Sequence, residues 1–160
     1  MNKVAERCRF PAMLDVGTGT GVLAIAGKAL GARFTVGIDI DPAAVFVARR
    51  NVGLNAGLPP IPGEADSSVH LLVSGMESIK GVFDIVAANL AAPTILNLRD
   101  SLVAATGQLL ILSGIADAMA REVVVSYSSA GCPPIMLKRR DGWNAALLET
   151  KAPCGKSGPT

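Results

Sequence analysis

The residues best suited to chemistry stand near the start of the chain, in the glycine-rich run DVGTGTG at positions 15–21. Glycines in a turn permit positive φ and let a ligand approach the backbone closely. Asp39 follows about 20 residues after Gly17, at the end of an apolar run that predicts a strand, where a carboxylate can accept hydrogen bonds from ribose hydroxyls. Together, the glycine turn and this acidic residue predict a site for a ligand that contains adenosine.

The pattern alone leaves other interpretations of these residues open. A tight turn needs small residues even without a ligand. Gly19, Gly21 and Ala24 also fit the GxGxxA form of the dinucleotide fingerprint, so a nicotinamide cofactor is not excluded. An aspartate at the end of a strand can simply be solvated. Asp41 is a different case, because it stands directly before Pro42 and is explained as the N-cap of a helix.

Apolar runs alternate with helical segments along most of the chain. Strands are predicted at residues 12–16, 34–40, 69–73, 83–89 and 108–114, and helices at 22–30, 42–57, 93–105 and 116–130. Two further strands, at 135–138 and 143–149, are joined by Asp141-Gly142, which favours a hairpin. The predicted fold class is α/β: a doubly wound, mostly parallel seven-stranded sheet, Rossmann-like, with a C-terminal antiparallel hairpin strand.

The composition fits one globular domain: 160 residues, a net charge of +2 and half of the residues apolar. The apolar content excludes a disordered chain. The small net charge predicts no direct nucleic-acid binding and no attraction to an anionic membrane. No stretch reaches the roughly 20 apolar residues that span a bilayer, and the first ten residues lack the apolar centre of a signal peptide. We therefore expect a soluble, cytoplasmic protein.

The remaining candidates for chemistry have plainer explanations. Cys8, Cys132 and Cys154 show no CxxC spacing, so neither a disulfide framework nor a zinc or other metal site is expected. The cysteines also show no histidine or basic signature of a nucleophile. His70 falls within a predicted strand and is interpreted as a buried or edge histidine, and Trp143 as a packing anchor of the hairpin.

Several runs together identify a family resemblance. The runs DVGTGTGVLAIA, VGIDIDPAAV, VARRNVGLNAG, FDIVAANLA, GQLLILSGI and GWNAALLE resemble class I S-adenosylmethionine-dependent methyltransferases. More narrowly, GIDIDP, the turn at Asn89 and LSGI are similar to the methyltransferases of ribosomal large-subunit protein eleven, the PrmA family. The resemblance covers about residues 12–150. It implies an N-methyltransferase that uses S-adenosylmethionine and acts on a lysine side chain or an α-amino group of a ribosomal protein.

The resemblance also implies a role for each matching position. The amino-acid part of S-adenosylmethionine would meet the glycine turn, and its ribose and adenine would meet the ends of the second and third strands. The residues expected at the donor are Asp15, Gly17, Thr18, Gly19, Gly21, Asp39, Ile40, Ser74, Met76 and Asn89, with Glu77 as a further candidate beside Met76.

Asn89 is the residue expected to be catalytic. Methyl transfer from a sulfonium is an in-line displacement, so alignment of the nucleophile with the methyl carbon can supply much of the rate. An amide side chain and a backbone carbonyl at Asn89 can accept the hydrogens of a neutral amine and direct its lone pair toward the methyl group. Asparagine is not a general base, so the proton would go to solvent or be lost before binding. The alternative is that Asn89 caps the helix before Pro93.

Residues 1–151 are expected to form the donor-binding methyltransferase domain, and residues 152–160 a flexible tail. PrmA-like enzymes carry a recognition domain before the first strand, and this sequence begins about a dozen residues before that strand. A non-catalytic S-adenosylmethionine-binding module is therefore an alternative to the enzyme. A nicotinamide-dependent oxidoreductase is a weaker one, because no acid or base for hydride transfer stands out.

Overall fold

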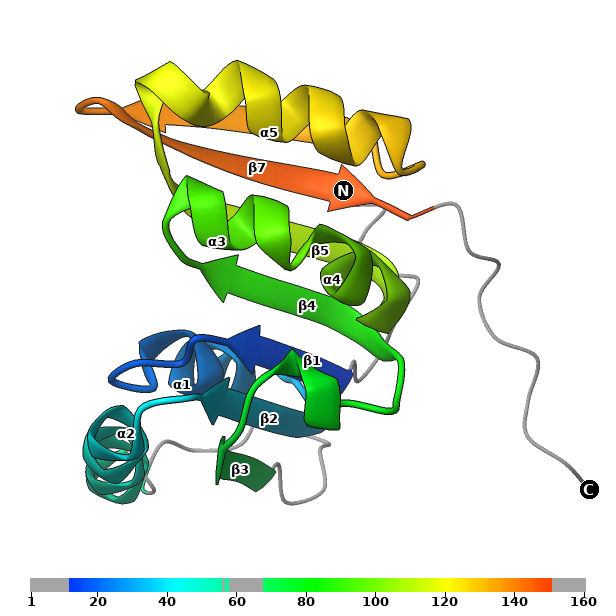
Figure 1. The fold of residues 1–160 in the computed structure, drawn as a ribbon. Coiled ribbons are helices and arrows are strands. Elements are labelled where there is room, and N and C mark those ends of the chain that lie inside the picture. Colours follow the sequence, from blue (N-terminus) through cyan, green and yellow to red (C-terminus); the bar gives the residue numbers. More distant parts are fainter. Residues whose placement is uncertain (1–11, 56, 58–67, 151–160) are drawn as a thin grey trace, which may run out of the picture.

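A computed structural model of the chain describes residues 12–55, 57 and 68–150 (Figure 1). Seven strands form one sheet in the order β3-β2-β1-β4-β5-β7-β6. The first five strands of the chain run parallel, and β7 is antiparallel to both β5 and β6. The strands are β1 (Ala12–Val16), β2 (Phe34–Asp39), β3 (Ser68–Val73), β4 (Phe83–Asn89), β5 (Thr106–Ala116), β6 (Pro134–Arg140) and β7 (Trp143–Glu149). The predicted doubly wound sheet with a closing antiparallel hairpin is confirmed.

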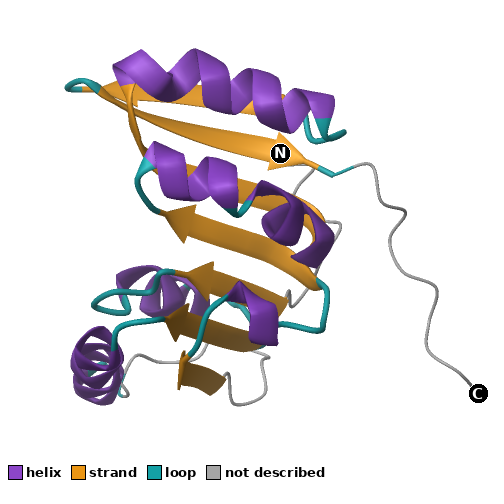
Figure 2. Cartoon of the chain, in the orientation of Figure 1, coloured by secondary structure: helices purple, strands orange, loops and turns teal. Residues whose placement is uncertain are grey.

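Helices lie on both faces of the sheet (Figures 1 and 2). The helices α3 (Ala92–Asn97), α4 (Arg99–Ala105) and α5 (Asp117–Ser129) cover one face, on the side of β4, β5 and β7. The helices α1 (Val22–Ala29) and α2 (Pro42–Leu54) pack against β1, β2 and β3. A short 3₁₀ turn, η1 (Met76–Ser78), follows β3. Parallel strands covered by helices read as apolar runs, which is why the sequence made them visible.

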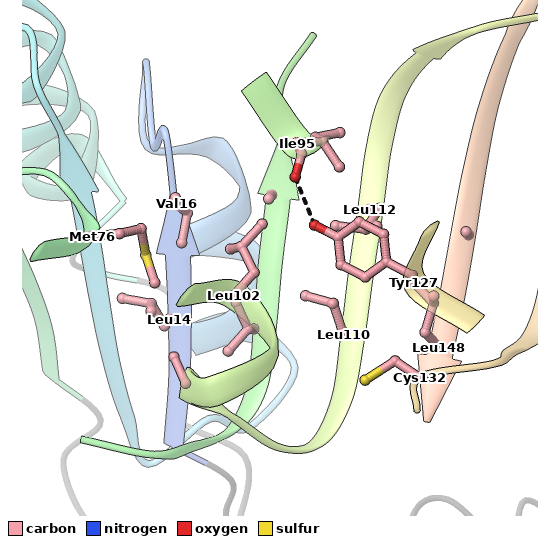
Figure 3. Packing of buried hydrophobic residues seen from close by; sticks show 14 of the residues in the cluster. Leu14, Val16, Met76, Ile95, Leu102, Leu110, Leu112, Tyr127, Cys132 and Leu148 are labelled. Carbon is pink, nitrogen blue, oxygen red and sulfur yellow. Dashed lines mark hydrogen bonds between the residues drawn. The ribbon is translucent and has the colours of Figure 1, made fainter. Parts of the chain in front are cut away.

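The main core is built from aliphatic side chains between the sheet and the helices α3, α4 and α5 (Figure 3). Leu14, Leu110 and Leu148 contribute from three strands, and Ile95 and Leu102 from two helices, all fully buried. Such close packing fixes the strands relative to one another, so the loops at their ends are held in defined positions.

The predicted helix at 93–105 is wrong in one respect, because the structure divides it into α3 and α4 at Leu98. The backbone of Leu98 has φ −89° and ψ 2°, outside helical values. Near this break, the buried hydroxyl of Tyr127 donates a hydrogen bond of 2.8 Å to the Ile95 carbonyl (Figure 3). The Ile95 carbonyl next to the break thus has a partner 32 residues away, and no local pattern contains that information.

Several other boundaries of strands and helices differ from those predicted from the sequence. Strand β5 spans Thr106–Ala116 rather than 108–114, and β6 spans Pro134–Arg140 rather than 135–138. Helix α2 ends at Leu54, before the predicted end at Gly57. The hairpin turn has positive φ at both Asp141 and Gly142, as an Asp-Gly turn of type I′ requires, and this prediction is confirmed.

The structure contradicts the sequence interpretation of Trp143 and confirms that of His70. The side chain of Trp143 is 58% exposed, so its interpretation as a packing anchor is wrong. His70 lies on the outermost strand β3, where its Nε2 is 3.0 Å from Ser68 Oγ and its ring is 5.0 Å from that of Phe34. The edge alternative for His70 is therefore confirmed.

Some sequence interpretations concern residues that the structure does not describe. These are Cys8, Cys154 and the predicted tail at 152–160. Cys132 is described: it is buried, and burial raises the pKa of its thiol, which is the opposite of what a nucleophile needs. Among the described helices, none is long and apolar enough to cross a membrane.

Candidate functional site

The candidate site lies at the carboxyl edge of the sheet, where the strand order reverses. Strand β1 lies between β2 and β4. From β1 the chain adds β2 and β3 on one side of β1 and then crosses to the other side, where β4 and β5 follow. This reversal brings the loop after β1 beside the ends of β2 and β4. Open α/β sheets bind ligands at such a position because the two loops diverge there.

The glycine loop that follows β1 is held firmly from two sides. Gly17, Gly19 and Gly21 all have positive φ, between 53° and 82°, which side chains other than glycine rarely adopt. The backbone N–H groups of Gly17 and Thr18 both donate to the Ile38 carbonyl at 2.9 Å. On the other side, Asn51 Nδ2 of α2 donates to the Thr20 carbonyl at 2.8 Å. The loop is therefore tied by hydrogen bonds to both β2 and α2.

Asp15 belongs to β1 and lies buried against the start of α1, with 1% of its surface exposed. Its Oδ2 accepts hydrogen bonds from Thr18 Oγ1 at 2.6 Å and from the Ala24 N–H at 3.1 Å. Its Oδ1 is buried and has no partner among the described residues. Burial raises the pKa of Asp15 above its usual value of 3.8, although the hydrogen bonds from Thr18 and Ala24 act in the opposite direction. An unpartnered buried carboxylate oxygen would gain from a cationic donor.

Asp39 ends β2 and closes the glycine loop from the neighbouring strand. Its Oδ2 accepts from the Gly19 N–H and its Oδ1 from the Asp41 N–H, both at 3.0 Å. An ionised carboxylate has about four acceptor sites, so each oxygen can accept a further hydrogen bond. The next side chain, Ile40, is apolar and 80% exposed. A carboxylate beside an exposed apolar side chain suits a hydroxylated sugar carrying a flat base.

Asp41 has the role that the sequence predicts. Its Oδ1 accepts a hydrogen bond of 2.8 Å from the Ala43 N–H, and Pro42 occupies the first turn of α2. This is an N-cap.

Asn89 ends β4 and is exposed at the same edge. The residue that caps α3 is Ala91, and no side-chain hydrogen bond caps this helix, so the alternative role of Asn89 as a cap is wrong. The turn after Asn89 is held in place because the Leu90 N–H donates to the Ser113 carbonyl of β5 at 3.2 Å.

The side chains after β3 are only partly at the edge. The Ser74 N–H donates to the Asp39 carbonyl at 2.9 Å, which ties β3 to the end of β2. Met76 is 7% exposed and belongs to the main core, where its sulfur lies near Leu14 and Val16 (Figure 3). The Glu77 side chain is exposed and turns back toward Gly75. Of these candidates, Ser74 is the one that the structure joins to Asp39.

A family model described as "Ribosomal protein L11 methyltransferase (PrmA)" matches residues 2–151, nearly the whole chain. The chain belongs to the ribosomal protein L11 methyltransferase family. A ribosomal protein L11 methyltransferase of Geobacter sulfurreducens is 39% identical over 141 residues, which are 87% of this chain and 44% of that protein. One of Myxococcus xanthus is 43% identical over 122 residues, 75% of this chain and 38% of that protein. The chain thus spans less than half the length of these two relatives.

Solved structures agree with the fold of this member of the L11 methyltransferase family. The crystal structure of a ribosomal protein L11 methylase from Lactobacillus delbrueckii subsp. bulgaricus matches with a TM-score of 0.79 and 26% identity, covering 91% of this chain and 72% of that one. Magnesium protoporphyrin IX methyltransferase from Synechocystis, crystallised with bound SAM, matches with a TM-score of 0.73 at 15% identity, which supports the fold alone.

Three residues that build this site of the L11 methyltransferase family member are not among the candidates predicted from the sequence. Asn51 binds the glycine loop from α2, Leu90 packs against Gly17, and Gly114 approaches Asn89 closely. The only signal was their presence within the runs VARRNVGLNAG, FDIVAANLA and LSGI that carry the resemblance. Their contacts join different strands and helices, so spacing along the chain could not reveal them.

Proposed function

We propose that this chain is the donor-binding and catalytic domain of an S-adenosylmethionine-dependent N-methyltransferase. The acceptor is a lysine side chain or an α-amino group of a ribosomal protein of the L11 type, in the cytoplasm. One observation carries the proposal: the glycine loop, Asp39 and Asn89 come from three different strands and meet at one edge of the sheet, at the reversal of strand order. Membership of the L11 methyltransferase family supports it.

The residues present fit the donor. The α-ammonium group of its amino-acid part would lie at Gly17, Gly19 and Gly21, close to the buried Asp15 whose Oδ1 has no partner among the described residues. Thr18 would contribute indirectly, because its buried hydroxyl donates a hydrogen bond to Oδ2 of Asp15 and so helps to fix that carboxylate.

The adenosine part would lie over the ends of β2 and β3. The carboxylate of Asp39 would accept hydrogen bonds from the ribose hydroxyls, and the exposed Ile40 would cover one face of the adenine. Ser74 would line the far side, with only the backbone of Met76 near it, since the Met76 side chain belongs to the core.

When bound, the donor supplies a methyl group on a sulfonium that is already activated toward displacement. The work left to the protein is to hold a neutral amine in line with that methyl group. The side-chain oxygen of Asn89 and the carbonyl of Leu90 are two acceptors in the same turn, and together they can orient the two hydrogens of an amine. The amine's proton leaves to solvent, since neither group is a base.

The experiment is isothermal titration of the chain with S-adenosylmethionine, its demethylated product and NAD. We expect the first two to bind and NAD not to bind. The variant Asp39→Ala removes charge-assisted hydrogen bonds and should weaken donor binding by about 1.5–3 kcal/mol. Asp41→Ala is the matched control, because it deletes a neighbouring carboxylate that only caps α2. Equal binding by Asp39→Ala and the unaltered chain, or preference for NAD, would reject the proposal.

Methyl transfer is tested separately with L11 protein and labelled donor. Asn89→Ala should reduce turnover much more than donor affinity, because the amide would hold the acceptor amine rather than the donor's sugar or base. Donor binding without transfer by the unaltered chain would favour the non-catalytic binding module.

A further inference from the structure

Gly114 of β5 lies against the turn formed by Asn89 and Leu90, the turn proposed to hold the acceptor amine. Its φ is +79°, and a Cβ atom added to it would lie 2.8 Å from the Leu90 carbonyl oxygen and 2.9 Å from Asn89 Oδ1. Real Cβ atoms essentially never approach other atoms so closely. The two oxygens therefore border the same small space, and that space is open only because residue 114 has no side chain.

We infer that Gly114 is a positioning residue that sets where both acceptor oxygens of the methyl-transfer site lie. The inference rests on the proposed function, in which Asn89 Oδ1 and the Leu90 carbonyl hold the amine. Gly114 touches neither donor nor amine and acts only through these two groups.

Of the two oxygens, the Leu90 carbonyl oxygen could not simply move aside, whereas Asn89 Oδ1 ends an exposed side chain and would be turned away from its position. The Leu90 carbonyl belongs to the backbone, and the N–H of the same residue is bound to the Ser113 carbonyl, next to Gly114. A methyl group at position 114 would therefore have to push the whole turn away from β5. In-line displacement tolerates little of this, since a misplacement of about 1 Å can cost roughly 100-fold in rate.

A simpler explanation of Gly114 is its positive φ alone, which any non-glycine residue would find strained. The chain contains a control for this explanation. Gly131 has a φ of +84°, and a Cβ added to it meets no atom within 4 Å. Gly131→Ala therefore imposes the same kind of backbone strain without a collision, and it lies after α5, away from the proposed site.

The test compares Gly114→Ala with Gly131→Ala in three measurements. In ¹⁵N-resolved NMR spectra, the side-chain NH₂ signals of Asn89 and the amide signal of Leu90 should shift in the first variant and stay in place in the second. Donor affinity by titration should stay within about threefold in both, because Asp15 and Asp39 are untouched. Turnover on L11 protein should fall about 100-fold in Gly114→Ala only.

A double variant separates collision from general damage. In an Asn89→Ala background one of the two colliding oxygens is gone, so Gly114→Ala should lower the urea midpoint less than it does alone. Additive effects, or unshifted Asn89 signals with normal turnover in Gly114→Ala, would overturn the assignment to Gly114. Failure of the unaltered chain to bind donor would instead overturn the proposed function, and the NMR comparison would still decide whether Gly114 places Asn89.

Discussion

The side chain of Leu90 lies directly over Gly17. A Cβ atom added to Gly17 would stand 2.3 Å from Leu90 Cδ2, so the two residues are in contact only because one of them is glycine. Gly17 belongs to the loop after β1 and Leu90 to the turn after β4, and these strands are neighbours in the sheet. The loop proposed to hold the donor and the turn proposed to hold the acceptor therefore touch, and a change in one is expected to reach the other.

Gly17→Ala should impair both halves of the site. The substitution forces a positive φ of 69° on a residue with a side chain, at a cost of about 1 kcal/mol or more, and it drives a methyl group into Leu90. We expect donor affinity and turnover both to fall by at least about tenfold, or about 1.4 kcal/mol, because the collision would displace the loop and the turn. Leu90→Ala in the same chain should recover part of the affinity by removing the collision, and the backbone strain should remain. Normal donor binding by Gly17→Ala would contradict the proposed role of this loop in holding the donor.

Asp15→Asn should change how stability depends on pH. Burial raises the pKa of Asp15 in the folded chain, so the folded state binds a proton more readily than the unfolded state. The contribution of Asp15 to stability is therefore most favourable at low pH and is lost as the pH rises from 3.8 through the raised pKa. Asparagine carries no charge and should abolish this loss. Urea unfolding measured from pH 4 to 8 checks the prediction: parallel curves for the two proteins would contradict it.

The same variant should weaken binding of S-adenosylmethionine, because a cationic amine would lose a charged partner. Titration with S-adenosylmethionine at neutral pH measures this affinity. Full affinity of a folded Asp15→Asn chain would show that Asp15 does not contribute to donor binding.

Tyr127→Phe should lower the free energy of unfolding by about 1–3 kcal/mol. The Tyr127 hydroxyl is fully buried and donates to the Ile95 carbonyl, which phenylalanine would leave without this donor at the break between α3 and α4. Ser129→Ala is the control, since its exposed hydroxyl donates to Val125 on the same helix and should cost little. Urea denaturation compares them. Equal stability of the two variants would mean that the Ile95 carbonyl finds another donor.

Asp117→Asn should reduce stability above pH 3.8, and this difference should vanish as the pH falls through about 2. Hydrogen bonds from Arg139 and Asn144 lower the pKa of Asp117 from 3.8 to about 2. The stability that this carboxylate contributes is therefore complete above 3.8 and disappears as the pH falls toward about 2. The effect is small because the pair is exposed to solvent. Thermal unfolding of both proteins across this range should show melting temperatures that converge at the acidic end.

Much of the fold could be predicted because its signals are local. The glycines of the loop after β1, Pro42 after Asp41, and Asp141-Gly142 in the hairpin each satisfy a backbone requirement within a few residues. Apolar runs of strand length gave the sheet, because strands buried on both faces must be apolar along their whole length. The ribose contact proposed for Asp39 could also be predicted locally. The apolar run before Asp39 indicates a buried strand, so Asp39 stands at the end of that strand.

The tertiary structure decided the contacts between elements that are distant in the chain. The break at Leu98, the burial of Met76, the exposure of Trp143 and the approach of Gly114 to Asn89 all depend on which strands and helices become neighbours. Spacing along the sequence determines which residues share a strand or a turn. It does not determine what lies across a gap of 3 Å, because that is set by the order of the strands and by how the whole core packs.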